Sequence, residues 1–454
     1  MVALLSARSR TARGRASLAG LTAGLLAVTG CGAPAGLIDV AQAARKACDV
    51  APPAKTTTVN VLAYSGPAID PFTDAIVKGC GGVKNLKIKH LPVDFSGQIQ
   101  KAALALSSGR SSPYDLIESY NGTLYEYASK GWIRPLDGYI AKYKDRYGLG
   151  DIDPKAWEGF TYQGKVYGIP DQTNAAILIY RKDLFDKIGL KAPRTYAEMI
   201  DAAKRLKAAK AVKYPLGMVW GSDDALADGF HAWLTADGGS WFDGAGRPAF
   251  DSPAGLKALQ QMKAMLPYMP SDSLTFGNGD VMALMQQGLI GMTTIWASRA
   301  QPIGDANQSR VAGKIAFAPA PSAVPGGPPA SETSQDGFVI PSNSHLDPEM
   351  LFRLAASTIT SPEVMKQAAT VAVPPRTSLV KDPATAQPYW PAVSESSARG
   401  VQPLPRVPYM DPLTKSVVNP YLAKALTGSS DPSRALRAAA AQLENSLKAK
   451  GYLR

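Results

Sequence analysis

The first part of the chain alternates strand-like runs with helical runs, and this alternation restricts the folds that it can adopt. Strand-like runs occupy residues 58–64, 86–90 and 114–118, and runs with helical spacing of apolar residues occupy 72–78, 96–107 and 124–128. Gly109 and Pro113 end the second helical run. Because no hairpin signal separates the strands, each strand is expected to reach the next through a helix. The pattern predicts an α/β fold with mainly parallel sheets whose faces are flanked by helices.

In parallel sheets, ligands bind beyond the carboxyl ends of the strands. The polar or aromatic residues that follow the three predicted strands are therefore candidate contacts. They are Tyr64, Ser65, Asp94, Phe95, Ser119, Tyr120 and Asn121.

The N-terminal segment indicates export. Four arginines lie within residues 8–15, residues 18–29 carry no charge, and the sequence VTGC follows at 28–31. An apolar run of roughly 12 residues is too short for a mature membrane span and is typical of a secretory signal. The ending resembles a bacterial lipobox. This predicts a signal peptide over 1–30, acylation of Cys31, and anchoring in the periplasm or at the outer face of the cell membrane.

Two alternatives to the lipoprotein interpretation remain open. The sequence AQA at 41–43 resembles an ordinary cleavage site, which would give a soluble secreted protein. An uncleaved anchor is the second alternative. Residues 31–57 are rich in small residues and proline, and we expect them to form a flexible, lipid-anchored tether.

The chain has three cysteines, Cys31, Cys48 and Cys80. If Cys31 carries lipid, the other two form an even pair in an oxidising compartment, which predicts a disulfide bond. Closing a loop of roughly 30 residues would stabilise the fold by about 3 kcal/mol. The alternative is two unrelated buried thiols. There is no CxxC motif and the three histidines are scattered, so we expect no metal site and no cofactor.

Length and charge indicate how many domains the chain forms and which partners are unlikely to bind it. Without residues 1–30 the chain keeps 424 of its 454 residues, which suits two domains. The net charge of +12 falls to +8, because the removed segment holds four arginines and no acid. The basic residues are spread without a block, which indicates a solvated surface and argues against a nucleic-acid partner.

Several segments, in their order along the chain, resemble one known family. They are YDLI at 114–117, ASKGWIRPL at 128–136, GKVYGIPDQTN at 164–174, IYRKDLF at 179–185, ADGG at 236–239, QGLIGM at 287–292, IPSNS at 340–344 and TSPE at 360–363. Over residues 58–450 the chain resembles the extracellular solute-binding proteins of ABC importers, family 1, to which maltose-binding protein belongs.

The resemblance implies a two-lobed periplasmic-binding-protein fold of type II with a hinged cleft. Lobe one would comprise residues 58–172 and 338–382, and lobe two residues 175–335 and 384–454. Such a protein would be a monomer that closes over a small solute and delivers it to the permease subunits of an ABC transporter. Hinge closure between rigid lobes can bury most of a small ligand.

The resemblance and the strand ends together select candidate ligand contacts. They are Tyr64, Ser65, Ser119, Tyr120, Asn121, Gln172, Asn174, Trp220, Asp228, Trp296, Arg299, Asp336 and Arg376. Asn174 would offer an amide donor and acceptor, and Trp296 a face for a sugar ring. Alternatively, residues 171–174 form a solvated turn, Trp296 and Tyr64 belong to the core, and the charged residues are only solvated. His231, near Asp228, is a further candidate.

The ligand is expected to be a sugar or polyol. At 119–121 the chain has neither the tryptophan nor the carboxylate–arginine pair found in maltose-binding protein, so maltodextrin is not expected. Arg299 and Arg376 keep a phosphorylated or acidic solute, such as a glycerophosphodiester, as an alternative. A glycosidase using two of Asp336, Asp228 and Glu118 is a further alternative, and a surface adhesin another. No catalytic motif supports an enzyme, so we expect a binding protein.

Overall fold

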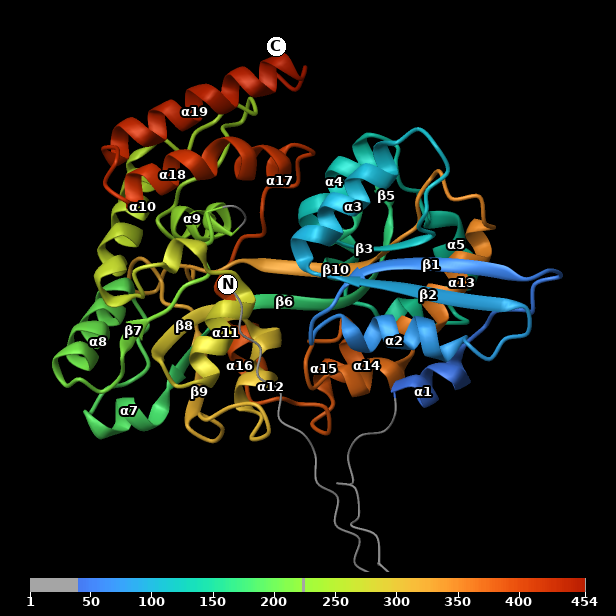
Figure 1. The fold of residues 1–454 in the computed structure, drawn as a ribbon, viewed down its shortest axis with the longest axis horizontal. Helices are drawn as coiled ribbons and strands as arrows, with labels where there is room; N and C mark the ends of the chain where they lie inside the picture. Colours follow the sequence, from blue (N-terminus) through green and yellow to red (C-terminus); the bar gives the residue numbers. More distant parts are fainter. Residues whose placement is uncertain (1–39, 223–224, 454) are drawn as a thin grey trace, which may run out of the picture. The chain divides into compact units, whose positions relative to one another are not determined.

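A computed structural model describes residues 40–222 and 225–453, which belong to one compact unit (Figure 1). The predicted signal peptide and the acylation site Cys31 lie outside the described residues, so both stay predictions. Within the two described ranges, no helix has the length and apolar character that crossing a bilayer requires.

One eight-stranded sheet runs through the molecule in the order β2-β1-β3-β10-β6-β8-β7, with β9 paired to β6. Its strands are β1 (Thr57–Tyr64), β2 (Leu86–Val93), β3 (Leu116–Tyr120), β6 (Gly168–Arg181), β7 (Tyr214–Leu216), β8 (Ile290–Trp296), β9 (Ile315–Pro319) and β10 (Thr333–Val339). A separate hairpin joins β4 (Thr161–Tyr162) to β5 (Lys165–Val166).

The two ends of the sheet differ from its middle in strand direction. β1 pairs in parallel with β2 and β3, as the sequence predicts, and β7 pairs in parallel with β8. β6 and β10 pair antiparallel with their neighbours. The first part of β6, residues 168–175, pairs with β10, and residues 176–181 pair with β8 and β9. This strand therefore carries the chain from one half of the sheet to the other, as the resemblance implies for 164–174.

Helices cover the half of the sheet that contains β1, β2, β3 and β10. They are α1 (Val40–Ala47), α2 (Asp70–Gly79), α3 (Phe95–Ser107), α4 (Asn121–Ser129), α5 (Asp137–Tyr143), α6 (Pro154–Gly159), α13 (Pro348–Ile359), α14 (Pro362–Ala368) and α15 (Thr377–Lys381). The strands and helices predicted between residues 58 and 129 are all present. Asp94 caps α3, since its side chain accepts a hydrogen bond of 2.6 Å from the Gly97 backbone N–H.

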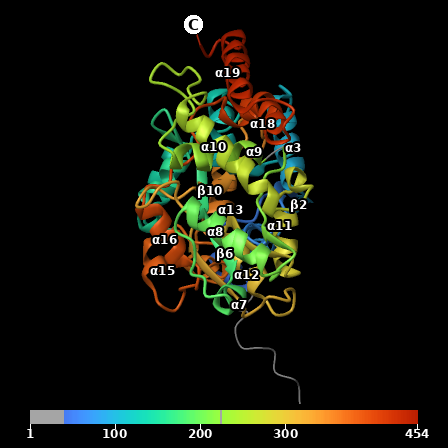
Figure 2. The ribbon, with the colours of Figure 1, turned by 90° about the vertical axis from the view of Figure 1, so that its left-hand side faces the viewer.

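The other half of the sheet carries its own set of helices, several of which face the viewer in Figure 2. They are α7 (Lys182–Lys187), α8 (Tyr196–Ala208), α9 (Leu226–Ala236), α10 (Pro253–Met265), α11 (Asn278–Gln286), α12 (Ala300–Gly304), α16 (Trp390–Ala398), α17 (Met410–Leu413), α18 (Asn419–Leu426) and α19 (Pro432–Ala449). Shorter turns are the 3-10 segments Leu149–Asp151, Leu266–Tyr268, Ser273–Thr275 and Ala297–Arg299 and the π-helical Thr414–Val418.

Each half has its own buried core. Phe72, Phe352 and Phe338 pack in the half that contains β1. In the other half Phe230 and Trp241 form an edge-to-face pair with ring centroids 5.5 Å apart. Two separate cores are what a two-lobed protein needs, because each lobe must stay rigid while the hinge moves. The lobe boundaries given by the resemblance stay a prediction.

Part of the predicted tether is folded, because residues 40–47 form helix α1. Ala44 is fully buried and lies so close to α2 that a Cβ built on Gly79 would be 2.6 Å from the Ala44 Cβ. Small residues, which in the sequence suggest a linker, here allow two helices to pack closely. The composition alone cannot separate these outcomes, since alanine favours both exposed flexible segments and tight helix contacts.

Two further contacts fix this segment. The predicted Cys48–Cys80 disulfide is confirmed, with the two Cα atoms 5.5 Å apart. Next to it, the Asp49 carboxylate accepts hydrogen bonds from Arg146 at 2.6 Å and from Arg353 at 2.9 Å. Burial raises the pKa of Asp49, but hydrogen bonds from the Tyr147 hydroxyl and from Arg353, together with the charges of the two arginines, lower it below its ordinary value. Residues 40–49 are thus part of the folded protein.

Candidate functional site

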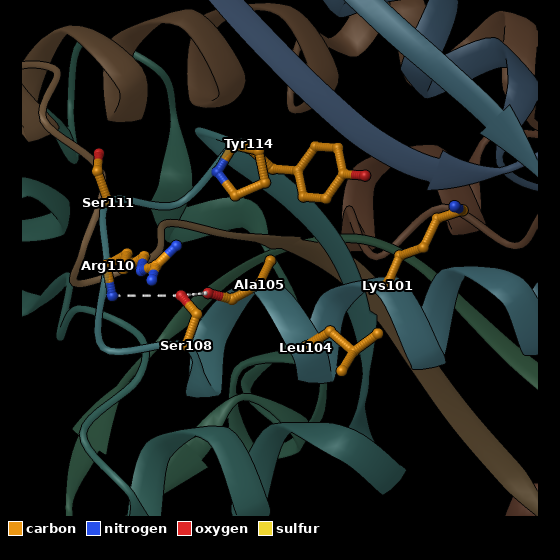
Figure 3. A pocket seen from close by; sticks show the side chains of 8 residues that line it. Lys101, Leu104, Ala105, Ser108, Arg110, Ser111 and Tyr114 are labelled. Carbon is orange, nitrogen blue, oxygen red and sulfur yellow. Dashed lines mark hydrogen bonds between the residues drawn. The ribbon is translucent and has the colours of Figure 1, made fainter.

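A cavity of about 630 Å³ lies among residues from both halves of the sheet. It is lined by strand ends and loops of the first half, by the crossing strand β6, and by β8, β10, α9 and α11. This volume falls in the range of small-molecule sites. A smaller hollow of about 390 Å³ lies at the end of α3, beside Leu104, Arg110 and Tyr114, and contains none of the candidate residues (Figure 3).

The first-half wall of the cavity consists of Tyr64, Ser65, Asp94, Phe95 and Tyr120. Each residue lies at or just after the carboxyl end of β1, β2 or β3. Because these strands are parallel, their ends meet at one edge of the sheet. The rings support one another, with centroid distances of 5.3 Å from Phe95 to Tyr64 and 5.4 Å from Phe95 to Tyr120.

The tryptophan wall, on the other side, consists of Trp220, Trp233 and Trp296. Trp220 and Trp233 expose only 3% and 5% of their surface. Trp296, the last residue of β8, is partly exposed to the cavity. The backbone of α9 comes close to Trp220, since a Cβ at Gly229 would lie 2.4 Å from the indole Nε1. Glycine at this position allows the ring to reach the cavity.

The floor of the cavity consists of Asn174, Ser334 and Asp336, from β6 and β10. The Asn174 amide donates a hydrogen bond of 3.1 Å to the Ser298 hydroxyl. Asp336 accepts one hydrogen bond of 2.8 Å from the Gln172 amide and one of 3.1 Å from the Ser334 hydroxyl. The floor therefore presents an amide, a hydroxyl and a carboxylate, which are groups that hydrogen-bond to the hydroxyls of a ligand.

Three carboxyl groups are buried at or near the floor. Burial raises the pKa of Asp336 to about 6, against the lowering effect of the Ser334 hydrogen bond and the Arg299 charge. Burial and the neighbouring Asp336 raise the pKa of Glu118 well above its usual range. The pKa of Asp171 rises for the same two reasons. Protons at this floor are therefore expected to respond to pH and to whatever occupies the cavity.

The structure brings most of the candidate contacts together around the cavity. Those that line it are Tyr64, Ser65, Tyr120, Asn174, Trp220, Asp228, Trp296, Arg299 and Asp336. Arg299 reaches toward the first-half wall, because its Nη1 lies 3.9 Å from a Cβ built on Gly66. That these residues contact a ligand stays a prediction.

Three candidates lie outside the lining, although they are close to it. Ser119 is buried, with its hydroxyl 2.9 Å from that of Thr123. Asn121 accepts a hydrogen bond of 3.1 Å from Ser334, and Gln172 donates to Asp336. Asn121 and Gln172 therefore hold two residues of the floor in position.

Arg376, which the sequence predicts as a ligand contact, does not line the cavity. It exposes 2% of its surface, and its guanidinium donates to the carbonyl oxygens of Thr360 at 2.7 Å, Tyr147 at 2.6 Å and Gly148 at 2.8 Å. The group holds three backbone segments together and has no free face for a solute. The sequence shows the charge but not these carbonyls, which come from distant segments.

His231 is also structural. The Trp241 indole donates to its Nδ1 at 3.1 Å, and burial lowers its pKa to about 4. Glu118 does not line the cavity, which removes one of the three carboxylates considered for a glycosidase. Within residues 40–222 and 225–453, no group of three His, Cys, Asp or Glu residues is arranged to hold a metal ion.

Sequence reasoning missed several lining residues. Glu332 and Ser334 precede Asp336 at intervals of two. Alternation along a strand places such residues on one face, so the period of two could have identified them. Lys415 lies in the π-helical Thr414–Val418, with its Nζ 2.9 Å from Asp411 and 3.4 Å from the Tyr120 hydroxyl. No sequence signal marks this lysine.

Comparisons with known proteins agree with this architecture. The family model for bacterial extracellular solute-binding proteins matches residues 75–365. The mannitol-binding protein of Pseudomonas aeruginosa is 28% identical over 360 residues, which are 74% of this chain and 80% of that protein. A solute-binding protein of Thermotoga lettingae, solved with α-D-tagatose, has a TM-score of 0.75 at 25% identity, over 86% of this chain and 99% of its own. One of Agrobacterium vitis, solved with D-mannitol, has a TM-score of 0.74 at 24% identity, over 87% and 99%.

The family match, the fold and the cavity lead to one assignment. The match covers more than half of the chain. The structural similarity extends over 86–87% of this chain and 99% of each solved chain. The chain belongs to the bacterial extracellular solute-binding proteins.

Proposed function

We propose that the protein is the substrate-binding component of an ABC transporter, which captures a sugar or polyol by lobe closure and delivers it to the permease. The observation that carries this proposal is the cavity itself. A partly exposed Trp296 lines this cavity together with a floor of amide, hydroxyl and carboxylate groups. An aromatic face suits the C–H face of a sugar, and the floor suits its hydroxyls.

The relatives support the same class of ligand. The Pseudomonas aeruginosa protein is named for mannitol, and the two solved structures hold tagatose and mannitol. In this chain the polyol would lie against the tryptophan wall and bond to Asn174 and Asp336. The crossing strand β6 and its partner β10 would act as the hinge.

Two parts of the proposal concern the ends of the transport cycle. Acylation of Cys31 would tether the protein to the membrane in which the permease lies. The bound solute would be released unchanged, because the protein is a carrier and not an enzyme. Cys31→Ser should therefore release the protein from membrane fractions, whereas unchanged membrane binding and processing would contradict the anchor.

A thermal-shift screen over sugars and polyols tests the ligand class. A ligand that binds only the native state raises the melting temperature. At a ligand concentration of one hundred times its Kd, it increases the free energy of unfolding by about 2.7 kcal/mol. We expect at least one sugar or polyol to give such a shift and to be recovered chemically intact. No shift across the screen would contradict the ligand class, and turnover of a bound sugar would contradict the role as a carrier.

A further inference from the structure

A hydrogen bond joins the two halves of the molecule beside the cavity. The Tyr120 hydroxyl donates to the Asp411 carboxylate at 2.8 Å. Tyr120 ends β3 and belongs to the first-half wall, whereas Asp411 lies in α17, 291 residues later in the chain. A bond between two lobes persists only while the lobes stay together, so this contact bears on the closed form of the protein.

Each partner of this bond is anchored in its own half. β3 pairs with β1 and β10, which fixes the position of Tyr120. Met410 and Leu413, which lie beside Asp411 in the sequence, are buried in the core of the other half. Movement of one half away from the other would therefore break the bond, while each residue would stay in place within its own half.

Lys415 adds further contacts between the same two halves. Its Nζ lies 2.9 Å from the Asp411 carboxylate and 3.4 Å from the Tyr120 hydroxyl. It also lies 5.9 Å from the centre of the Phe95 ring, which belongs to the first-half wall. An ammonium group at this distance is attracted to the face of an aromatic ring. Tyr120, Asp411 and Lys415 thus form one connected bridge, which we call the latch.

The charged pair of the latch is largely shielded from water. The Lys415 and Asp411 side chains expose 15% and 7% of their surface. The ion pair between Arg406 and Glu158 of α6 is a contrast, because its atoms are 3.4 Å apart and its side chains are 43% and 57% exposed. Exposed pairs contribute little to stability, whereas shielded hydrogen bonds to charged groups are stronger. The latch is therefore better suited than the exposed pair to hold the halves together.

The backbone at Lys415 is also unusual. This residue lies in the π-helical Thr414–Val418, between α17 and α18. Single π-helical turns are rare and occur frequently at functional sites. Lys415 and Tyr120 both line the cavity, so the unusual turn lies where the latch meets the space for the solute.

We propose that Asp411 and Lys415 are positioning residues that latch Tyr120 across the cavity and thereby set how long the protein stays closed. This inference rests on the proposed function, because it concerns the lobe closure that captures the solute. Asp411 is not among the residues that line the cavity. It acts through Tyr120, since apparent affinity rises with the fraction of the protein that is in the binding-competent form.

Single-molecule fluorescence energy transfer measures the lifetime of the closed form. Dyes are attached to Lys89→Cys on β2 and Lys204→Cys on α8, two exposed positions in opposite halves, in a Cys31→Ser background. The probes are D-mannitol and D-tagatose, which the two solved relatives hold, and any compound that the thermal-shift screen selects. Lifetimes are recorded with and without each probe, and calorimetry gives the dissociation constant.

The variants remove one group of the latch at a time. Tyr120→Phe keeps the ring and removes the hydroxyl, and Asp411→Asn removes the carboxylate charge. Each should shorten the lifetime of the probe-bound closed form and raise the Kd, both by about tenfold. The double variant should be little worse than either single variant, because both remove the same bond. Lys415→Met should shorten the lifetime as well.

Tyr147→Phe is the matched control. Its hydroxyl donates to the Asp49 carboxylate at 2.6 Å, and both residues belong to the same half. Removing this hydroxyl should lower the melting temperature, because a hydrogen bond to a charged group is lost. The closed lifetime and the Kd should be unchanged, because opening of the lobes leaves this bond intact.

The outcomes separate the latch from the proposed function. If Tyr120→Phe and Asp411→Asn bind the probe with the parent's Kd and closed lifetime, the latch is overturned while the proposed function stands. Additive effects of these two variants would also overturn it, since the two residues would then act independently. If no probe binds, but the variants shorten the closed lifetime of the probe-free protein, the ligand class is overturned and the latch stands. If no probe binds and the lifetimes are equal, both are overturned.

Discussion

The two walls of the cavity are built from different parts of the protein architecture. The first-half wall consists of residues that end parallel strands, so the sheet itself sets their positions. The tryptophan wall comes from a loop, from α9 and from the end of β8, so only one of its three rings ends a strand. In the first wall the backbone positions the contacts, whereas in the second wall the packing of a few large rings must do so.

The rings of the tryptophan wall also differ from one another in burial. Trp220 is 3% exposed and touches α9 at Gly229, so most of its ring belongs to the core. Trp296 is partly exposed and ends a strand. One ring should therefore support the fold, and the other should serve the ligand.

Trp220→Ala should give the largest loss of stability among the variants considered. Removing a buried tryptophan costs about 3–5 kcal/mol, because apolar contacts are lost and a cavity remains. Urea unfolding of the ligand-free protein measures this loss. A variant that unfolds at the same urea concentration as the parent would place Trp220 outside the core and make the two walls more alike than we infer.

The half of the sheet that carries the first-half wall is also held by a disulfide bond. Replacing both Cys48 and Cys80 with serine should cost about 3 kcal/mol, since the bond closes a long loop in the unfolded chain. The unfolding midpoint of the variant, compared with that of the parent protein under reducing and non-reducing conditions, measures this effect. The parent under reducing conditions should match the variant. An equal midpoint in all three samples would show that α1 and its ion pairs suffice to hold the segment.

The two walls also differ in how far the sequence could predict them. Tyr64, Ser65, Asp94, Phe95 and Tyr120 follow predictable strands, and the rule that ligands bind beyond strand ends locates them without a homologue. Trp220 and Trp296 could be proposed only through the family resemblance, because neither periodicity nor spacing distinguishes a cavity tryptophan from a core one.

Contacts between residues far apart in the sequence explain why the roles of Arg376, Lys415 and α1 were not predicted. Arg376 looks like a cleft cation in the sequence, but carbonyl oxygens from two other segments enclose it. Lys415 looks like an ordinary surface lysine, but Tyr120, which is 295 residues away, lies beside it. The helix α1 has the composition of a linker and is packed. In each case the decisive neighbour is remote in sequence, and one sequence carries no record of that proximity.

The floor between the two walls should make stability depend on pH. The pKa of folded Asp336 is about 6, against an ordinary value of 3.8, so the protonated carboxyl favours the folded state. Its contribution is complete below pH 4 and is lost as the pH rises through about 6. A shift of this size corresponds to on the order of 3 kcal/mol. Unfolding free energies measured between pH 3.5 and 7.5 should fall by less in Asp336→Asn than in the parent.

The control for this prediction is a carboxyl group whose pKa is shifted in the opposite direction. Asp49 has a lowered pKa, so its contribution is present at neutral pH and is lost on acidification. Asp49→Asn should therefore be less stable than the parent at neutral pH. Its free energy of unfolding should still decrease between pH 4 and 6, as in the parent. Identical pH profiles for Asp336→Asn and the parent would show that Asp336 does not carry the proton.

Trp296→Ala should have the smallest effect on stability and a clear effect on binding. Loss of a stacked ring costs roughly 1–3 kcal/mol of binding free energy, which is about 5- to 150-fold in affinity. Calorimetry with a ligand from the screen measures this change, and the melting temperature of the ligand-free variant should change little. Trp132→Ala, which removes a partly exposed tryptophan that does not line the cavity, is the matched control and should bind normally. A Trp296→Ala protein that is destabilised like Trp220→Ala, yet binds with unchanged affinity, would place both rings in the core. The ligand would then be held by the first-half wall and the floor alone.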